Sequence, residues 1–140
     1  SRTWIANGTP DDRQRRLYAA SYEHVHRNME LLGPGITFAE LCAKGFTYSP
    51  DLAEQNFTTI FHGLGLENEW PIIKSPDKLD IPGAYGGGYD GVIEAGMTLC
   101  IESYAGEVGG PDGVKLEEMV LITETGAEPL GLTPYEESWL

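Results

Sequence analysis

Two apolar segments with the pattern of β-strands each carry a glutamate in their interior, and a third such segment carries a histidine. These segments are residues 97–102, 114–118 and 61–66. A charged group on a buried strand is costly unless it has a partner. The fold must therefore supply a partner or solvent for Glu102, Glu117 and His62.

The two-residue period of a strand predicts which of these side chains share a face. Cys100, Glu102 and Tyr104 lie on one face of the segment 97–104. Glu102 and Glu117 are separated by 15 positions across a hairpin-like connection, so neighbouring strands can bring them together. Two carboxylates in contact repel each other unless a cation or a proton lies between them. A divalent ion, or a pair of ions, would remove this repulsion.

An imidazole with two carboxylates is a ligand set that suits Mn, Fe, Co or Zn, and paired ions of this kind activate water for hydrolysis. The spacing alone leaves a second interpretation open. His62 would then be a core histidine, and the two glutamates would be surface positions on half-exposed strands. His24 and His26 face different ways on a predicted helix, and we interpret them as surface or structural positions.

Helix signals come first in the chain and strand signals later. Thr9 and Pro10 predict the start of a first helix that ends before residues 33–35, and Thr37 opens a capping box for a second helix that reaches about Lys44. Strands are predicted at 57–61, 97–104 and 114–123, with a long loop at 71–96. Helices followed by strands indicate an α+β fold with two helices packed on an antiparallel sheet.

Composition limits the class of protein. The chain has 140 residues and a formal net charge of −13, which disfavours nucleic acid and anionic membrane as partners. No apolar run is long enough to span a bilayer, and nothing resembles a signal peptide. Cys42 and Cys100 have no metal or redox spacing, and we expect buried thiols of a cytoplasmic protein.

Several motifs, in order along almost the whole chain, resemble the creatinase, prolidase and methionine aminopeptidase group of "pita-bread" metalloenzymes. They are the strand end at 1–4, the helix at 14–23, the turn at 32–35, the histidine motif at 62–66, and the strands at 96–102 and 113–117. The resemblance implies the C-terminal half of that fold, so residues 1–140 form one partial domain. Much of the group dimerises, and exposed core strands favour pairing into a homodimer.

Carried over to this sequence, the resemblance implies that His62 and Glu102 bind one metal ion and that Glu117 bridges a pair. The group also uses two aspartates from earlier strands, and neither is in these 140 residues. The implied function is that of an Xaa-Pro dipeptidase-like hydrolase, in which a metal-activated water attacks the peptide bond of a small peptide.

Two alternatives stay open. The segment 62–71 also resembles metal-dependent dimethylsulfoniopropionate lyases, in which a base removes a proton from a small-molecule substrate. Those enzymes have an aspartate where this chain has Asn68, so Glu69 or Tyr104 is the candidate catalytic base here. The second alternative is a binding module of the same fold without catalysis.

Overall fold

The long first helix, α1, spans Asp12–Met29 and begins with a reciprocal capping box. In this computed structural model, which describes residues 1–65, 69–78 and 91–140, the Asp11 carboxylate accepts a hydrogen bond from the backbone N–H of Gln14 at 2.7 Å. The Gln14 side chain accepts one in return from the backbone of Asp11. Thr9 was the predicted cap, but Asp11 makes both bonds of the box, so the helix begins after Asp11.

Two shorter helices follow. α2 spans Phe38–Lys44, and Thr37 forms the predicted capping box with Glu40. α3 spans Pro50–Ala53, a single turn that the sequence analysis missed because one turn has too few residues for a periodic pattern. Two 3₁₀ turns, η1 (Pro76–Lys78) and η2 (Glu137–Trp139), complete the helical elements of the described residues.

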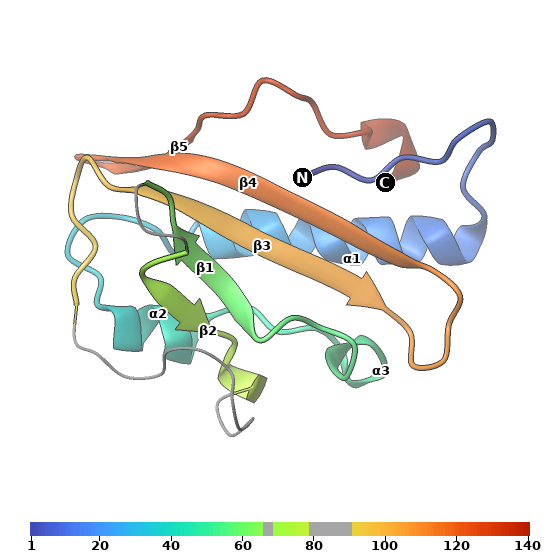
Figure 1. Cartoon of the computed structure of the whole chain (residues 1–140), viewed down its shortest axis with the longest axis horizontal. Helices are drawn as coiled ribbons and strands as arrows, with labels where there is room; N and C mark the ends of the chain where they lie inside the picture. Colours follow the sequence, from blue (N-terminus) through green and yellow to red (C-terminus); the bar gives the residue numbers. More distant parts are fainter. Residues whose placement is uncertain (66–68, 79–90) are drawn as a thin grey trace.

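Five strands form one antiparallel sheet in the order β2-β1-β3-β4-β5 (Figure 1). Their bounds are Thr59–Gly63 for β1, Ile72–Lys74 for β2, Thr98–Gly106 for β3, Gly113–Thr123 for β4 and Gly126–Pro129 for β5. The predicted loop at 71–96 is therefore wrong in part, since it contains β2 and η1. β2 has only three residues, which are too few to show an alternation of apolar and polar side chains in the sequence. Its pairing with β1 is visible only in the structure. Residues 79–90 of that loop lie outside the described part of the chain.

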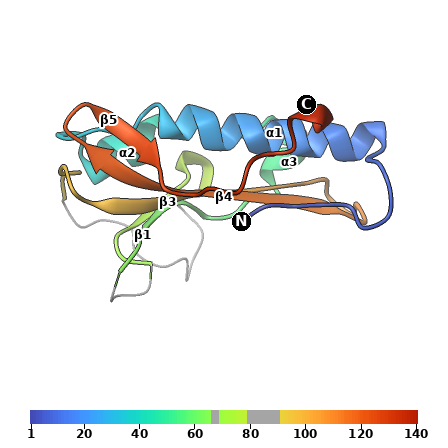
Figure 2. The same ribbon diagram turned by 90° about the horizontal axis from the view of Figure 1, so that it is seen from above.

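The helices cover one face of the sheet, as the view from above shows (Figure 2). Alternate strand residues point toward them: Leu99, Ile101 and Ala105 of β3 are almost fully buried, as are Leu116 and Val120 of β4. Burial of each such side chain stabilises the fold by about 1.5–3 kcal/mol. The intervening residues of β3 and β4 point to the opposite face, and Glu102 and Glu117 are among them.

A buried hydroxyl cluster fixes α1 on β3. The Ser21 and Ser103 hydroxyls are 2.5 Å apart, and the Tyr48 hydroxyl also lies 2.5 Å from Ser103. The Tyr48 ring stacks on His24 at a centroid distance of 4.7 Å. His24 is fully buried, so it has a structural position, whereas His26 is half-buried and stacks on Tyr22.

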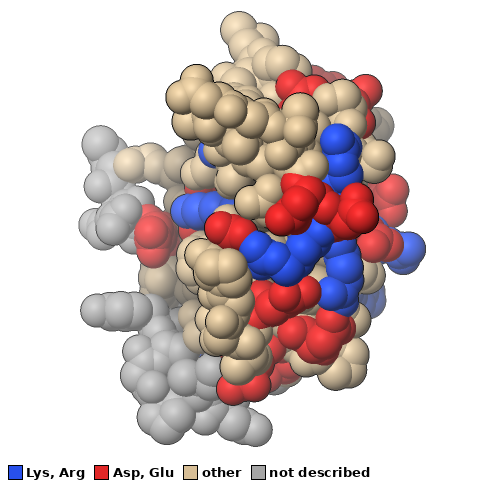
Figure 3. Space-filling model, turned by 90° about the vertical axis from the view of Figure 1, so that its right-hand side faces the viewer, with Lys and Arg blue, Asp and Glu red and all other residues tan. Residues whose placement is uncertain are grey.

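Surface charges of opposite sign are interspersed on the side of the molecule drawn in Figure 3. Arg16 of α1 bonds Asp51 of α3 and lies 3.0 Å from Glu107 in the β3–β4 connection, while Arg13 pairs with Asp112. These three acidic side chains are thus paired with arginines of α1. Among the described residues, no helix has the length and apolar character needed to cross a membrane.

Candidate metal centre

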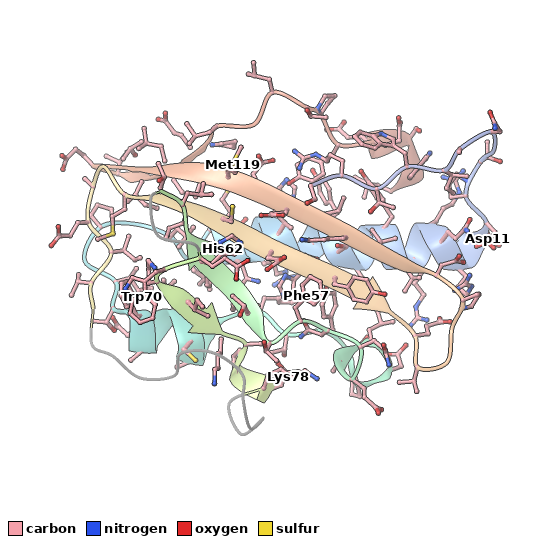
Figure 4. All side chains as sticks on the ribbon, in the orientation of Figure 1. Asp11, Phe57, His62, Trp70, Lys78 and Met119 are labelled. Atoms are coloured by element: carbon pink, nitrogen blue, oxygen red, sulfur yellow. The ribbon has the colours of Figure 1, made fainter. Side chains whose placement is uncertain are left out.

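Three adjacent strands bring the predicted histidine and glutamates together on the face that the helices leave uncovered. His62 of β1 is opposite Cys100 of β3, and Glu102 of β3 is opposite Glu117 of β4. Directly paired residues of an antiparallel sheet have Cβ atoms about 4.5–5.5 Å apart. Figure 4 shows His62 on β1, with Met119 above it and Phe57 below and to its right.

The polar atoms of this cluster are close to one another. His62 Nε2 lies 3.5 Å from Glu117 Oε1 and 3.9 Å from Glu102 Oε2. Lys115 Nζ lies 2.7 Å from Glu102 Oε1 and 3.4 Å from Glu117 Oε2. The Ser1 hydroxyl donates a hydrogen bond to Glu117 Oε2 at 2.8 Å. Two carboxylates thus share one imidazole and one ammonium group.

The His62 ring is held in a defined orientation by the backbone. Its Nδ1 lies 3.1 Å from the carbonyl oxygen of Gly63. Because a carbonyl can only accept, Nδ1 must carry the hydrogen and Nε2 is the atom directed at the carboxylates. This backbone bond is the usual way in which a metal-binding histidine is oriented.

The charges of the cluster compensate one another. Hydrogen bonding to Cys100 and Glu117 raises the pKa of His62 to about 10. The bond to His62 holds the pKa of Glu117 well below its usual range. Although burial acts in the opposite direction, pairing with Glu102 and Glu117 raises the pKa of Lys115. At neutral pH, His62 and Lys115 are therefore both cationic, and they compensate the negative charges of Glu102 and Glu117.

The residues present fit a divalent metal ion. A ring nitrogen of His62, Cys100 Sγ and a Glu117 oxygen lie within 4.8 Å of one another, and Glu102 is the direct neighbour of Glu117. The ammonium group of Lys115 lies close to both carboxylates, where a metal ion would otherwise compensate their charge. The two-residue period of the strand places Cys100 on the face of Glu102, but no cysteine spacing in the sequence identifies it as a candidate ligand.

The two candidate catalytic residues lie apart from one another. Tyr104 is half-buried, opposite Lys115 in the β3–β4 register, and stacks on Phe57 at 5.2 Å. Glu69 is exposed in the β1–β2 connection with φ of 59°. Within the described residues it has no hydrogen bond or ion pair to the cluster. Asn68, the other residue of this segment that bears on the lyase alternative, lies outside the described part of the chain.

A second ionic pair lies on the opposite side of β4 and was missed by the sequence analysis. Arg2 Nη2 is 2.6 Å from Glu118 Oε2, and both side chains are nearly buried, with exposed fractions of 7% and 5%. Arg2 Nη1 also donates to the Glu117 carbonyl oxygen at 2.7 Å, and its guanidinium stacks on Tyr135 at 3.8 Å. No local pattern could show a contact between residues more than 110 positions apart in the sequence.

Several known proteins are similar to this chain in sequence. The model of metallopeptidase family M24 matches residues 1–124. Dimethylsulfoniopropionate lyase from Roseovarius nubinhibens is 38% identical over 133 residues, covering 95% of this chain and 29% of that protein. Xaa-Pro dipeptidase from Pyrococcus furiosus is 33% identical over 137 residues, covering 94% of this chain and 35% of that protein.

Solved structures agree with these matches. Prolidase from Pyrococcus furiosus superimposes with a TM-score of 0.68 at 31% identity, covering 93% of this chain and 36% of that protein. Prolidase from Pyrococcus horikoshii gives a TM-score of 0.69 at 28% identity, covering 94% and 35%. The chain spans about a third of the length of these relatives. The likeness confirms the predicted α+β architecture as part of the pita-bread fold.

Proposed function

This chain belongs to metallopeptidase family M24, and we propose from that premise that it forms part of a metal-dependent hydrolase of the Xaa-Pro dipeptidase type. The observation that carries the proposal is the convergence of His62, Glu102 and Glu117 from three adjacent strands on one face of the sheet. Sequence similarity to Xaa-Pro dipeptidases over 94% of the chain supports it.

In this proposal, His62 and Glu102 would hold one divalent ion, and Glu117 would be shared with a second. A metal pair supplies a water that is activated at neutral pH and a Lewis acid for the substrate carbonyl. The Gly63 carbonyl orients the His62 ring through Nδ1. Arg2 holds the backbone of Glu117 in place from the opposite side of the strand. The family's two aspartate ligands would come from sequence outside these 140 residues.

The finer features of the proposal follow the same premise. The ions would be Mn, Co, Fe or Zn, the substrate a small peptide, and the protein a cytoplasmic homodimer. An open hollow lined by Phe57, Thr58, Thr59 and Glu102 lies beside the cluster. We place the substrate at this hollow. Hydrolysis adds one water across the peptide C–N bond, so that Gly-Pro gives glycine and free proline.

A lyase is the second candidate, because identity to two dimethylsulfoniopropionate lyases reaches 38% and 39%. In that reaction a base removes a proton, the C–S bond breaks, and a volatile sulfide leaves without addition of water. Asn68 is an amide and cannot accept a proton at neutral pH. Tyr104, on the same face of β3 as Glu102, and the exposed Glu69 are the candidate bases.

The first experiment measures metal content. The protein with its full natural sequence is equilibrated with Mn(II) or Co(II), desalted and analysed by elemental mass spectrometry. We expect retained metal that is lost in His62→Ala and kept in His26→Ala, a matched histidine on α1. No retained metal in the parent protein would contradict the proposal and favour a binding module without catalysis.

The second experiment identifies the reaction. The metal-loaded protein is incubated separately with Gly-Pro and with dimethylsulfoniopropionate. Free proline in the first incubation supports the hydrolase. Sulfide in the headspace of the second, without proline in the first, would overturn it in favour of the lyase.

A further inference from the structure

We propose that Cys100 is an additional metal ligand of this centre, with its thiolate sulfur bound to the same ion as His62 Nε2 and Glu117. This inference rests on the proposed function to the extent that a metal ion binds there. It adds a sulfur donor to a site otherwise made of nitrogen and oxygen ligands. Because sulfur and oxygen ligands favour different metals, Cys100 would influence which metal the site prefers.

The register of the sheet carries the geometry. Cys100 is the direct cross-strand partner of His62, and it lies two residues before Glu102 on the same strand. Cys100 Sγ, a ring nitrogen of His62 and a Glu117 oxygen are all within 4.8 Å of one another. Two ligands bound to one ion at about 2.0 and 2.3 Å are separated by at most about 4.3 Å. A small side-chain adjustment is therefore enough for all three to reach a common ion.

The direction of the side chain distinguishes Cys100 from an ordinary core thiol. Its neighbours Leu99 and Ile101 point into the core beneath the helices. The strand period directs Cys100 to the other face, toward the glutamates. It is nonetheless only 2% exposed. A buried sulfur atom on the site face, close to His62 and Glu117, is placed to bind an ion rather than to fill the core.

Coordination of Cys100 would release its thiol proton, and coordination of His62, which is cationic in the metal-free cluster, would release the proton on Nε2. The S–H bond breaks, the proton passes to solvent, and a sulfur lone pair forms the bond to the metal. No oxidant or reductant is needed, because the metal keeps its oxidation state. A thiolate favours Zn(II), Co(II) and Fe(II) over the harder Mn(II). We therefore expect Cys100 to shift the preference of the site away from Mn(II).

Cobalt spectroscopy tests the proposal without any assay of activity. The protein with its full natural sequence is titrated with Co(II), and its absorption is recorded in the visible and near-ultraviolet. We expect visible d–d bands with a sulfur-to-cobalt charge-transfer band in the near-ultraviolet. The charge-transfer band should vanish in Cys100→Ser and persist in Cys42→Ser, which removes the other free cysteine.

A competition experiment gives a second readout. Changing an outer-shell partner of a metal typically costs about 10–100-fold in affinity, and loss of a direct ligand should cost no less. Because a thiolate favours Zn(II) over Mn(II), this loss should fall mainly on Zn(II). We therefore expect Cys100→Ser to lower the ratio of Zn(II) affinity to Mn(II) affinity by about tenfold or more, and Cys42→Ser to leave the ratio unchanged.

The outcomes separate this inference from the proposed function. Visible bands without a charge-transfer band, or an unchanged Zn(II)/Mn(II) ratio in Cys100→Ser, would overturn the role of Cys100 and leave the metal centre standing. Absence of any cobalt spectrum at stoichiometric metal would overturn both. If Cys100→Ser fails to fold, Cys100→Ala is recorded in its place, and retention of the charge-transfer band there would contradict the proposal.

Discussion

Glu102 and Glu117 are direct cross-strand partners in β3 and β4, so two carboxylates stand side by side on one face of the sheet. Like charges at directly opposite positions destabilise a sheet. The chain offsets this repulsion with its own cations, since Lys115 reaches both carboxylates and His62 lies beside them. Under the proposed function, a metal ion would replace these protein cations beside the two carboxylates.

Glu102→Gln should abolish tight metal binding while leaving the fold intact. The amide keeps the size of the side chain and removes both the repulsion by Glu117 and the ion pair with Lys115, so the free energy of unfolding of the metal-free protein should change by less than about 1 kcal/mol. Calorimetric titration with Co(II) should show at least about a tenfold loss of affinity. Glu124→Gln, on an exposed turn, is the control, and equal affinities in both variants would contradict a ligand role.

Lys115→Met should raise metal affinity several-fold. The ammonium group competes with a metal ion for both carboxylates and repels it, and both effects end when the charge is removed. Because the Lys115 side chain is 38% exposed, the metal-free protein should lose less than about 1 kcal/mol of stability. Titration with Mn(II) measures the first effect and urea unfolding the second. Weaker metal binding in Lys115→Met would show that the lysine orients the ligands instead.

The buried pair of Arg2 and Glu118 should contribute strongly to stability through its coupling. Arg2→Met or Glu118→Leu alone leaves a charge buried without its partner, which costs about 3 kcal/mol. The double variant leaves neither charge buried without a partner. Its loss of unfolding free energy should therefore be smaller than the sum of the losses in the two single variants. Urea unfolding of the four proteins measures this coupling. Strict additivity would mean that the two side chains act independently.

Acid should destabilise the protein through His24. Burial lowers the pKa of His24 to about 4, with a weak opposing effect of Asp77, whereas an unfolded histidine titrates near about 6.5. The unfolded chain therefore binds a proton that the folded chain does not, and stability decreases as the pH falls from about 6.5 toward 4. At pH 5 the loss should be about 2 kcal/mol.

His24→Phe isolates this effect, because the phenyl ring can keep the stack on Tyr48 without a titratable group. Unfolding free energies at pH 7.5 and pH 5 are compared between this variant and the parent protein. The parent should lose about 2 kcal/mol more than the variant. A loss of the same size in both proteins would mean that His24 is not the group responsible.

Gly63→Ala should disrupt the site through the backbone. A Cβ atom at position 63 would overlap the backbone carbonyl of Trp70, and the same glycine donates its N–H to Pro71 across the β1–β2 pair at 2.8 Å. Because backbone cannot move aside as a flexible side chain can, we expect a loss of about 3 kcal/mol. Metal affinity should also fall, since His62 is the preceding residue.

Gly126→Ala is the matched control for this prediction. Gly126 also lies in a strand, but a Cβ there meets no atom within 4 Å. Thermal unfolding should show a markedly lower midpoint for Gly63→Ala than for Gly126→Ala. Similar midpoints would show that β1 and β2 can separate without cost to the fold.

Local sequence signals were sufficient for the elements that define their own ends or faces. The capping box at Thr37 and Glu40 specifies a helix start within four residues, and the alternation in 97–104 and 114–123 assigns Glu102 and Glu117 to a face before any partner is known. Short elements such as α3 and β2 carry no such pattern. Their existence depends on the surfaces against which they pack.

The sequence by itself determined the α+β class and the side of each strand on which Glu102 and Glu117 lie, because the two-residue period is a local property of the backbone. Only the tertiary structure decided which residues meet. The register placed Cys100 opposite His62 and Glu102 opposite Glu117, and it brought Arg2 to Glu118. Register and long-range ionic pairing depend on the packing of the whole sheet against α1, since a slip of one residue would turn every buried side chain outward.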